Sequence, residues 1–186
     1  MEAIAHTFVS FGFADGRYLP VSIEIRPEVG EAYGMLEGFF KQYELIYIWG
    51  DERDLIRSRT NYRKEDAYLY RVNMTPENIQ KLFVSMLMRT NSLHEAPQFY
   101  NTLFESCTNT IGDHLKAAKI MEIPFWKRRV RTGDIDRRLY HDGLLDTSVP
   151  FDELRKAAHV NQRAQAADHA LDFSKLIRTH LKDQGQ

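Results

Sequence analysis

The stretch that decides the fold lies at residues 6–25, which read HTFVSFGFADGRYLPVSIEI. Apolar side chains alternate with other residues on both sides of residues 14–16, a pattern typical of two half-buried β-strands. The Ala-Asp-Gly step between them suits a three-residue hairpin loop closed by glycine in the left-handed conformation, which pairs Phe13 with Arg17. The sequence therefore predicts a β-hairpin near the start of the chain.

The register of this hairpin decides which side chains share a face. Counting outward from the turn, the pairs on the apolar face are Phe11 with Leu19, Val9 with Val21, and Thr7 with Ile23. On the other face His6 lies opposite Glu24. A carboxylate beside an imidazole fixes its tautomer and raises its basicity, as in Cys-His and Ser-His sites. A simple surface pair has the same pattern, so a catalytic reading depends on what else the chain offers.

Further elements follow along the chain. Residues 43–49 predict a buried strand, and Leu55–Thr60 and Ala67–Val72 predict two short strands, so residues 1–75 are β-rich. Residues 76–186 are mainly helical. Four helices are predicted. The first begins after the Thr75 N-cap, and the second begins near Ser106 with Cys107 in its first turn. The other two span Asp152–Ala167 and Phe173–Leu181. These elements predict an α+β fold in which helices pack on an antiparallel sheet.

Composition bounds the class of protein. The chain has 186 residues, of which 43% are hydrophobic and 27% charged, which suits one domain over residues 1–186. The 25 lysine and arginine residues balance 26 aspartate and glutamate residues, which argues against nucleic acid as a partner. No apolar run reaches the roughly 18 residues of a membrane span, and the first residues do not resemble a signal peptide.

Cys107 is the single cysteine, which excludes an intrachain disulfide framework and multi-cysteine zinc sites. A lone cysteine is most often a small buried hydrophobe. In the first turn of a helix, however, unpaired amides and the helix dipole stabilise a thiolate, and the same amides can bind an oxyanion. Its base must come from the seven histidines. His114 is a rise of roughly 10 Å away along the same helix, too far for a hydrogen bond. Five others lie in predicted surface loops or polar C-terminal helices, which leaves His6 on a strand opposite Glu24.

The segment from Lys127 to Arg138 is locally basic. It could face phosphate head groups at a membrane surface, although a solvated loop with ordinary surface pairs has the same composition. A membrane surface is therefore one candidate partner.

Several segments together resemble one known family. They are His6–Phe11, Gln42–Tyr47, Arg59–Arg63, Tyr100–Asn109 and Leu144–Ser148. In this order they resemble the bacterial Lnb N-terminal periplasmic domain family, from residue 3 to about residue 165. The resemblance implies a permuted papain-like fold of the lecithin:retinol acyltransferase group, in which a strand histidine precedes a helix cysteine. The matching positions are His6 and Cys107.

The family's named members are linked to N-acylation of bacterial lipoproteins through a cysteine thioester, so the resemblance implies a location in the periplasm or cell envelope. Members carry an export signal that this chain lacks, and we expect an excised domain. We predict Cys107 as nucleophile, His6 as general base and Glu24 as orienting carboxylate, with no cofactor and no metal. The expected partners are a lipid or acylated donor and an amine or peptide acceptor.

Two alternatives stay open at this point. A cysteine amidase or peptidase acting on envelope peptides would use the same three residues and differ only in what resolves the thioester. A non-catalytic envelope binding domain would instead bury Cys107 as a packing residue.

Overall fold

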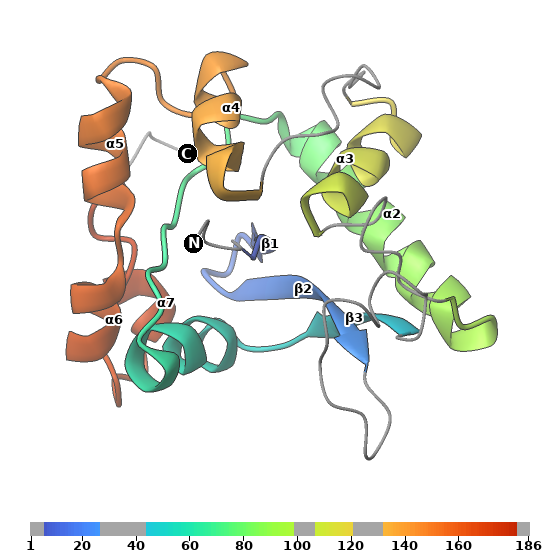
Figure 1. Ribbon diagram of the computed structural model, residues 1–186, viewed down its shortest axis with the longest axis horizontal. Helices are drawn as coiled ribbons and strands as arrows, with labels where there is room; N and C mark the ends of the chain where they lie inside the picture. The colour runs from blue at the N-terminus through green and yellow to red at the C-terminus, as the bar shows by residue number, and fades with distance from the viewer. Residues whose placement is uncertain (1–5, 27–43, 99–106, 121–131, 182–186) are drawn as a thin grey trace. The chain divides into compact units, whose positions relative to one another are not determined.

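The computed structural model describes residues 6–26, 44–98, 107–120 and 132–181. Sequence predictions for the connection at 27–38, for residues 100–106 of the fourth family segment and for residues 127–131 of the basic segment lie outside the described residues. The elements, in chain order, are β1 (Phe8–Gly12), β2 (Tyr18–Arg26), β3 (Glu44–Trp49), η1 (Arg53–Arg63), α2 (Pro76–Glu95), α3 (Cys107–Ala117), η3 (Thr132–Asp134), α4 (Ile135–His141), α5 (Phe151–Ala158), α6 (Asn161–Ala166) and α7 (Phe173–Leu176) (Figure 1).

The strands form a three-stranded antiparallel sheet in the order β1-β2-β3, and helices account for much of the remaining described chain, so the α+β prediction is confirmed. The hairpin turn is also confirmed. Phe13 N donates to Arg17 O at 2.9 Å, and Gly16 N donates to Phe13 O at 2.9 Å. Gly16 has a φ of +81°, the left-handed conformation that a glycine adopts without steric cost.

The chain divides into two compact units. The first consists of residues 1–9, 21–49 and 75–135, and the second of residues 10–20, 50–74 and 136–186. Each unit is therefore assembled from segments that are distant in the sequence. The single domain expected for residues 1–186 stays a prediction.

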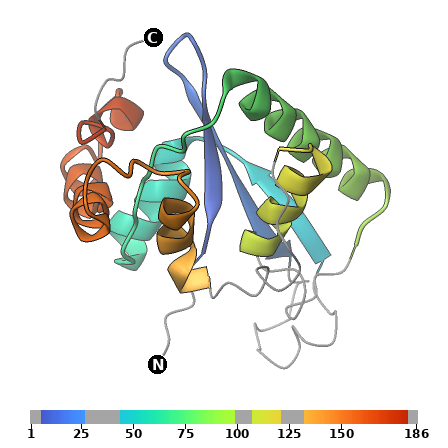
Figure 2. The ribbon, with the colours of Figure 1, turned by 90° about the horizontal axis from the view of Figure 1, so that it is seen from above.

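In the first unit, β2 pairs with β3 so that Val21 lies opposite Trp49 and Ile23 opposite Tyr47. Because side chains alternate along a strand, these four share one face. Helices α2 and α3 pack beside β3, where the Trp49 indole meets the Phe83 ring edge to face at a centroid distance of 5.7 Å (Figure 2). Helix α2 begins at Pro76 with the Thr75 side chain accepting from Asn78 N, as predicted.

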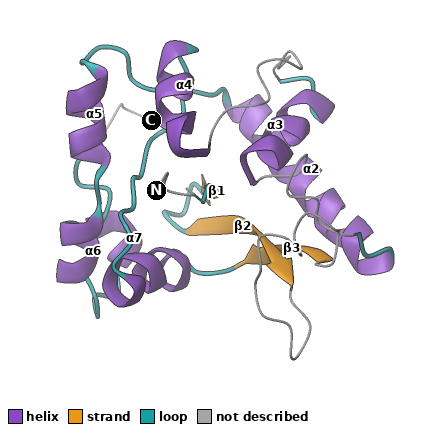
Figure 3. Cartoon of the chain, in the orientation of Figure 1, coloured by secondary structure: helices purple, strands orange, loops and turns teal. Residues whose placement is uncertain are grey.

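The prediction of a strand at Leu55–Thr60 is wrong. The segment Arg53–Arg63 is the π-helix η1, shown as a helix in Figure 3. Leu55, Ile56 and Thr60 are its buried residues, and the β-branched residues among them suggested a strand. Contacts with the segment after α6 hold this helix, because Arg57 Nε lies 2.5 Å from Asp168 Oδ1 and Asn61 Nδ2 lies 2.6 Å from the same oxygen.

The isolated bridge between Tyr68 and His159 corrects two predictions, one for a strand and one for a helix. The expected strand at Ala67–Val72 forms only an isolated antiparallel bridge between Tyr68 and His159. The expected helix at Asp152–Ala167 is two helices, α5 and α6, which are interrupted at that bridge. Backbone groups beside His159 bond to the extended segment instead of continuing a helix. The predicted helix from Phe173 to Leu181 ends early, since α7 stops at Leu176.

A buried ion pair lies in the second unit. Glu52 is 0% exposed, and its carboxylate receives both terminal nitrogens of Arg178 together with the Ser10 hydroxyl. The Arg178 guanidinium also stacks on the Tyr18 ring, 3.5 Å from its centroid. A charge without access to water requires this degree of pairing.

Candidate functional site

His6 and Glu24 meet in the first unit as the hairpin register predicts. His6 lies just before β1 begins at Phe8, and Glu24 lies in β2. His6 Nε2 is 3.2 Å from Glu24 Oε1, with side-chain exposures of 27% and 30%. The predicted contact is confirmed, and its catalytic role stays a prediction. The half-exposed position leaves the imidazole within reach of a reactant.

Ser22 is a member of this cluster that sequence reasoning missed. Its hydroxyl donates to Glu24 Oε1 at 2.6 Å and lies 2.7 Å from His6 Nε2. The side chain is almost fully buried, with Ser22 1% exposed. The available signal was its spacing, because residues two apart on a strand share a face.

The Ser22 contacts fix the role of each imidazole nitrogen. A hydroxyl has one proton, and that of Ser22 goes to Glu24, so its oxygen must accept a hydrogen bond from His6 Nε2. The proton of a neutral His6 ring is therefore on Nε2. The basic lone pair belongs to Nδ1, and this is the nitrogen that could take a proton from a thiol.

Helix α3 begins at Cys107, so the predicted place of the cysteine in the first helical turn is confirmed. Its side chain lies outside the described part of the structure. The neighbouring residues are in contact, because Thr7 Oγ1 and Thr108 Oγ1 are 3.2 Å apart across 101 positions of sequence. The residue after His6 therefore touches the residue after Cys107.

Strand geometry separates the side chains of His6 and Thr7. Successive side chains of an extended chain point to opposite sides. Thr7 reaches α3, whereas His6 reaches Ser22 and Glu24 of β2. The side chains of His6 and Thr7 therefore reach different neighbours, β2 and α3.

His114, which sequence analysis set aside as too distant from Cys107, lies in a different environment. It is buried between Tyr47 and Ser85, whose hydroxyls lie 2.7 Å from Nε2 and 2.8 Å from Nδ1. Burial lowers the pKa of His114 to about 4, and the positive charge of Arg89 contributes. The ring borders a groove of about 470 Å³ in the first unit, but it is a weak base with both nitrogens engaged.

Among the described residues, no group of three or more histidine, cysteine, aspartate or glutamate side chains could hold a metal ion. None of the described helices combines the length and apolar character needed to cross a membrane.

The segments that carried the family resemblance fall in both units. His6–Phe11 enters the hairpin, whereas Arg59–Arg63 lies on η1 in the second unit. In that segment Asn61 binds Asp168, and the Thr60 carbonyl accepts from Gln165 Nε2 at 3.2 Å. These contacts hold η1 to the segment around α6, which is a structural role for Thr60 and Asn61.

Comparison with known proteins gave one family. The family model described as Lnb N-terminal periplasmic domain matches residues 1–133. The matched part contains His6, Ser22, Glu24 and Cys107 and ends before α4 begins. No curated protein matches the chain, and no solved structure matches it.

Proposed function

The chain belongs to the Lnb N-terminal periplasmic domain family, and from this membership and the site geometry we propose that it performs cysteine-dependent acyl transfer at the bacterial cell envelope. The observation that carries the proposal is the oriented imidazole of His6, held through Nε2 by Ser22 and Glu24 beside the helix that begins at Cys107. The order of histidine strand and cysteine helix fits the permuted papain-like arrangement that is part of this proposal.

In the first half-reaction, His6 Nδ1 takes the thiol proton of Cys107, and the thiolate attacks the carbonyl carbon of an acyl ester. The tetrahedral intermediate collapses by breaking the bond to the alcohol oxygen, which receives the proton from the imidazolium. The products are a Cys107 thioester and a free alcohol. Glu24 stabilises the imidazolium that forms in between, through its contact at 3.2 Å.

In the second half-reaction, an amine attacks the thioester carbonyl while His6 removes one of its protons. The bond to sulfur breaks, the thiolate leaves, and the proton returns to it from the imidazolium, which yields an amide and restores Cys107. Water in place of the amine makes the same protein a hydrolase. For the transferase, the family resemblance favours the terminal amine of a lipoprotein as the acceptor.

The start of α3 supplies a further group that this chemistry requires. The first amides of a helix have no partner within the helix, and they favour a negative charge nearby. Helix α3 begins at Cys107 itself, so the amides of the following residues are candidate donors for the oxyanion that forms when the thiolate attacks the substrate carbonyl.

The test is formation of an acyl adduct. The full chain is incubated with p-nitrophenyl octanoate, or with phospholipid vesicles as a natural type of donor, and analysed by intact-protein and peptide mass spectrometry. We expect one octanoyl group on Cys107, none on Cys107→Ala, and much slower labelling of His6→Ala. His94→Ala, which changes an exposed histidine of α2, is the matched control and should react like the unaltered chain.

The outcomes separate the alternatives. A folded protein that forms no Cys107 adduct with either donor would be a binding domain, and the proposal would be wrong. An adduct that persists in Cys107→Ala would assign the chemistry to another nucleophile. If the adduct forms, adding glycine amide or water alone then distinguishes a transferase from a hydrolase by the product that carries the octanoyl group.

A further inference from the structure

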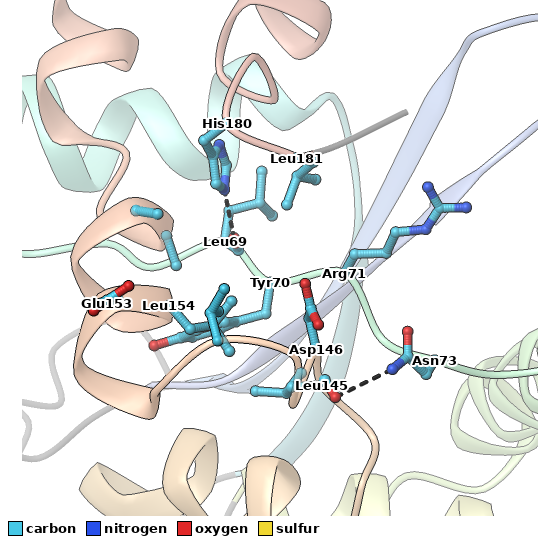
Figure 4. A pocket seen from close by; sticks show the side chains of 13 residues that line it. Leu69, Tyr70, Arg71, Asn73, Leu145, Asp146, Glu153, Leu154, His180 and Leu181 are labelled. Atoms are coloured by element: carbon cyan, nitrogen blue, oxygen red, sulfur yellow. Dashed lines mark hydrogen bonds between the residues drawn. The ribbon is translucent and has the colours of Figure 1, made fainter. Parts of the chain in front are cut away.

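We propose that the second unit contains a peptide-binding pocket, in which an extended peptide pairs with the backbone of Arg71 and inserts one aliphatic side chain. The pocket has a volume of about 240 Å³ and lies between the segment at 69–73, helix α5 and the turn at 145–149 (Figure 4). All of these residues belong to the second unit. The proposal does not depend on the chemistry proposed for Cys107.

The backbone of residues 67–73 forms an incomplete hydrogen-bond ladder. Residues 67, 69 and 73 of this segment form backbone hydrogen bonds along one edge. Ala67 O accepts from Val160 N at 2.9 Å, Leu69 N donates to Ala158 O at 2.8 Å, and Asn73 N donates to Leu144 O at 2.8 Å. His180 Nε2 donates to Leu69 O at 3.0 Å. The spacing of two residues is that of an extended chain that presents its backbone groups alternately to either edge.

Arg71 is the position where this ladder is interrupted. It falls in the same alternate series as Leu69 and Asn73, so its N–H and C=O are directed to the same edge. Among the residues that the structure describes, neither backbone group has a hydrogen-bond partner, and its guanidinium has no ion pair. The antiparallel partner stops because the chain preceding Ala158 is helical.

A peptide residue can complete the ladder. One residue of an antiparallel strand exchanges two hydrogen bonds with its partner, accepting from the N–H and donating to the C=O. Such strand addition gives affinity through the main chain and specificity through side-chain pockets. Leu145, Val149 and Leu154 form the apolar part of the lining, which suits an aliphatic side chain of the bound peptide.

Charge narrows the choice of peptide. The lining includes the carboxylate of Glu153, which forms no ion pair among the residues that the structure describes. A lysine beside the aliphatic residue would complement it. The chain's own residues 182–186, Lys-Asp-Gln-Gly-Gln, contain no apolar side chain that could fill the pocket, and a separate peptide is the occupant that we infer.

The probe is a fluorescein-labelled pentapeptide with leucine at its centre, one lysine beside it and glycine elsewhere, titrated with the full chain and followed by fluorescence anisotropy. A series of the same peptide replaces each amide in turn by an ester, which removes one N–H donor at a time. We expect saturable binding that weakens about 10-fold at one ester position. Equal binding of all esters would overturn backbone pairing.

Protein variants test the same geometry from the other side. Arg71→Pro removes the N–H, whereas Arg71→Ala keeps it, so we expect a loss of about 10-fold for proline and little change for alanine. Ala157→Phe, at an exposed position that lines the pocket, should abolish binding, and Lys156→Phe is the matched control on α5. Binding that survives Ala157→Phe, or displacement by octanoate with no ester effect, would overturn the proposal.

Discussion

The imidazoles of two histidines in the first unit, His6 and His114, differ in their exposure and in their hydrogen-bond partners. His6 is half-exposed at the start of a strand and contacts a carboxylate through a serine hydroxyl and directly at 3.2 Å. His114 is buried, and two hydroxyls occupy both ring nitrogens. A carboxylate can stabilise an imidazolium, and hydroxyls at a buried site cannot do so to the same extent. The partner and the access to water, rather than the residue type, separate a candidate base from a structural link.

The largest effect should come from removing the candidate base. His6→Ala is expected to slow acylation of Cys107 by about 100- to 10,000-fold, the range of general-base contributions. Its free energy of unfolding should change by less than about 1 kcal/mol, because the side chain is half-exposed. Single-turnover labelling and urea unfolding provide the two measurements. A variant that acylates at the normal rate would remove His6 from the site.

The second prediction concerns the pH dependence of stability. Burial lowers the pKa of His114 to about 4 in the folded protein, compared with about 6.5 for an unfolded chain. Between these values the unfolded state binds a proton that the folded state does not. The contribution to stability is therefore complete above pH 6.5 and is lost as pH falls toward 4, by about 3 kcal/mol.

Urea unfolding at a series of pH values measures this loss. His114→Gln cannot titrate, so its stability should vary less between pH 6.5 and 4 than that of the unaltered chain. Other groups titrate in both proteins, and the difference between the two curves isolates the imidazole. Parallel curves would mean that His114 is protonated as easily in the folded state as in the unfolded one.

The third prediction concerns the same side chain at constant pH. At pH 7.5, His114→Gln should lower the free energy of unfolding by about 2 kcal/mol, because an amide cannot reach both Tyr47 and Ser85 in the geometry of the ring and one buried hydroxyl loses its partner. His94→Gln, at an exposed position of α2, should change it by less than about 0.5 kcal/mol. Equal effects at the two positions would show that burial does not distinguish them.

The smallest effects should come from the residues that orient His6. Glu24→Gln is expected to slow acylation about 10-fold through loss of imidazolium stabilisation. Ser22→Ala should slow it only about 3-fold, because His6 Nε2 keeps its direct contact with Glu24. Single-turnover rates of the two variants give the ranking. An unchanged Glu24→Gln rate would leave a dyad of cysteine and histidine, and a larger loss for Ser22→Ala would make the hydroxyl the main partner.

The contact between His6 and Glu24 could be predicted because strand alternation and one glycine turn fix the register over the whole hairpin. Ser22 could not be found in the same way, since it lies diagonally from His6 and does not titrate. The burial of His114 between two hydroxyls depends on Tyr47 of β3 and Ser85 of α2. No local pattern relates these residues to α3.

The secondary structure, too, could be predicted only where local sequence signals decide it. Strand β3 and the starts of α2 and α3 follow from short signals such as aromatic and β-branched runs or the Thr75-Pro76 cap. Helix η1 was missed because its residues favour a strand locally, while its anchor, Asp168, lies 111 positions from Arg57. Tertiary contacts outweigh propensity where the local preference is weak.

The buried pair of Glu52 and Arg178 has a consequence for the order of synthesis. The two residues are 126 positions apart, and a chain emerges from the ribosome with its N-terminal part first. Until Arg178 has been made, the carboxylate of Glu52 has no guanidinium to neutralise it, and burying it alone would cost several kcal/mol. The second unit should therefore remain open to chaperones and proteases until Arg178 has been translated.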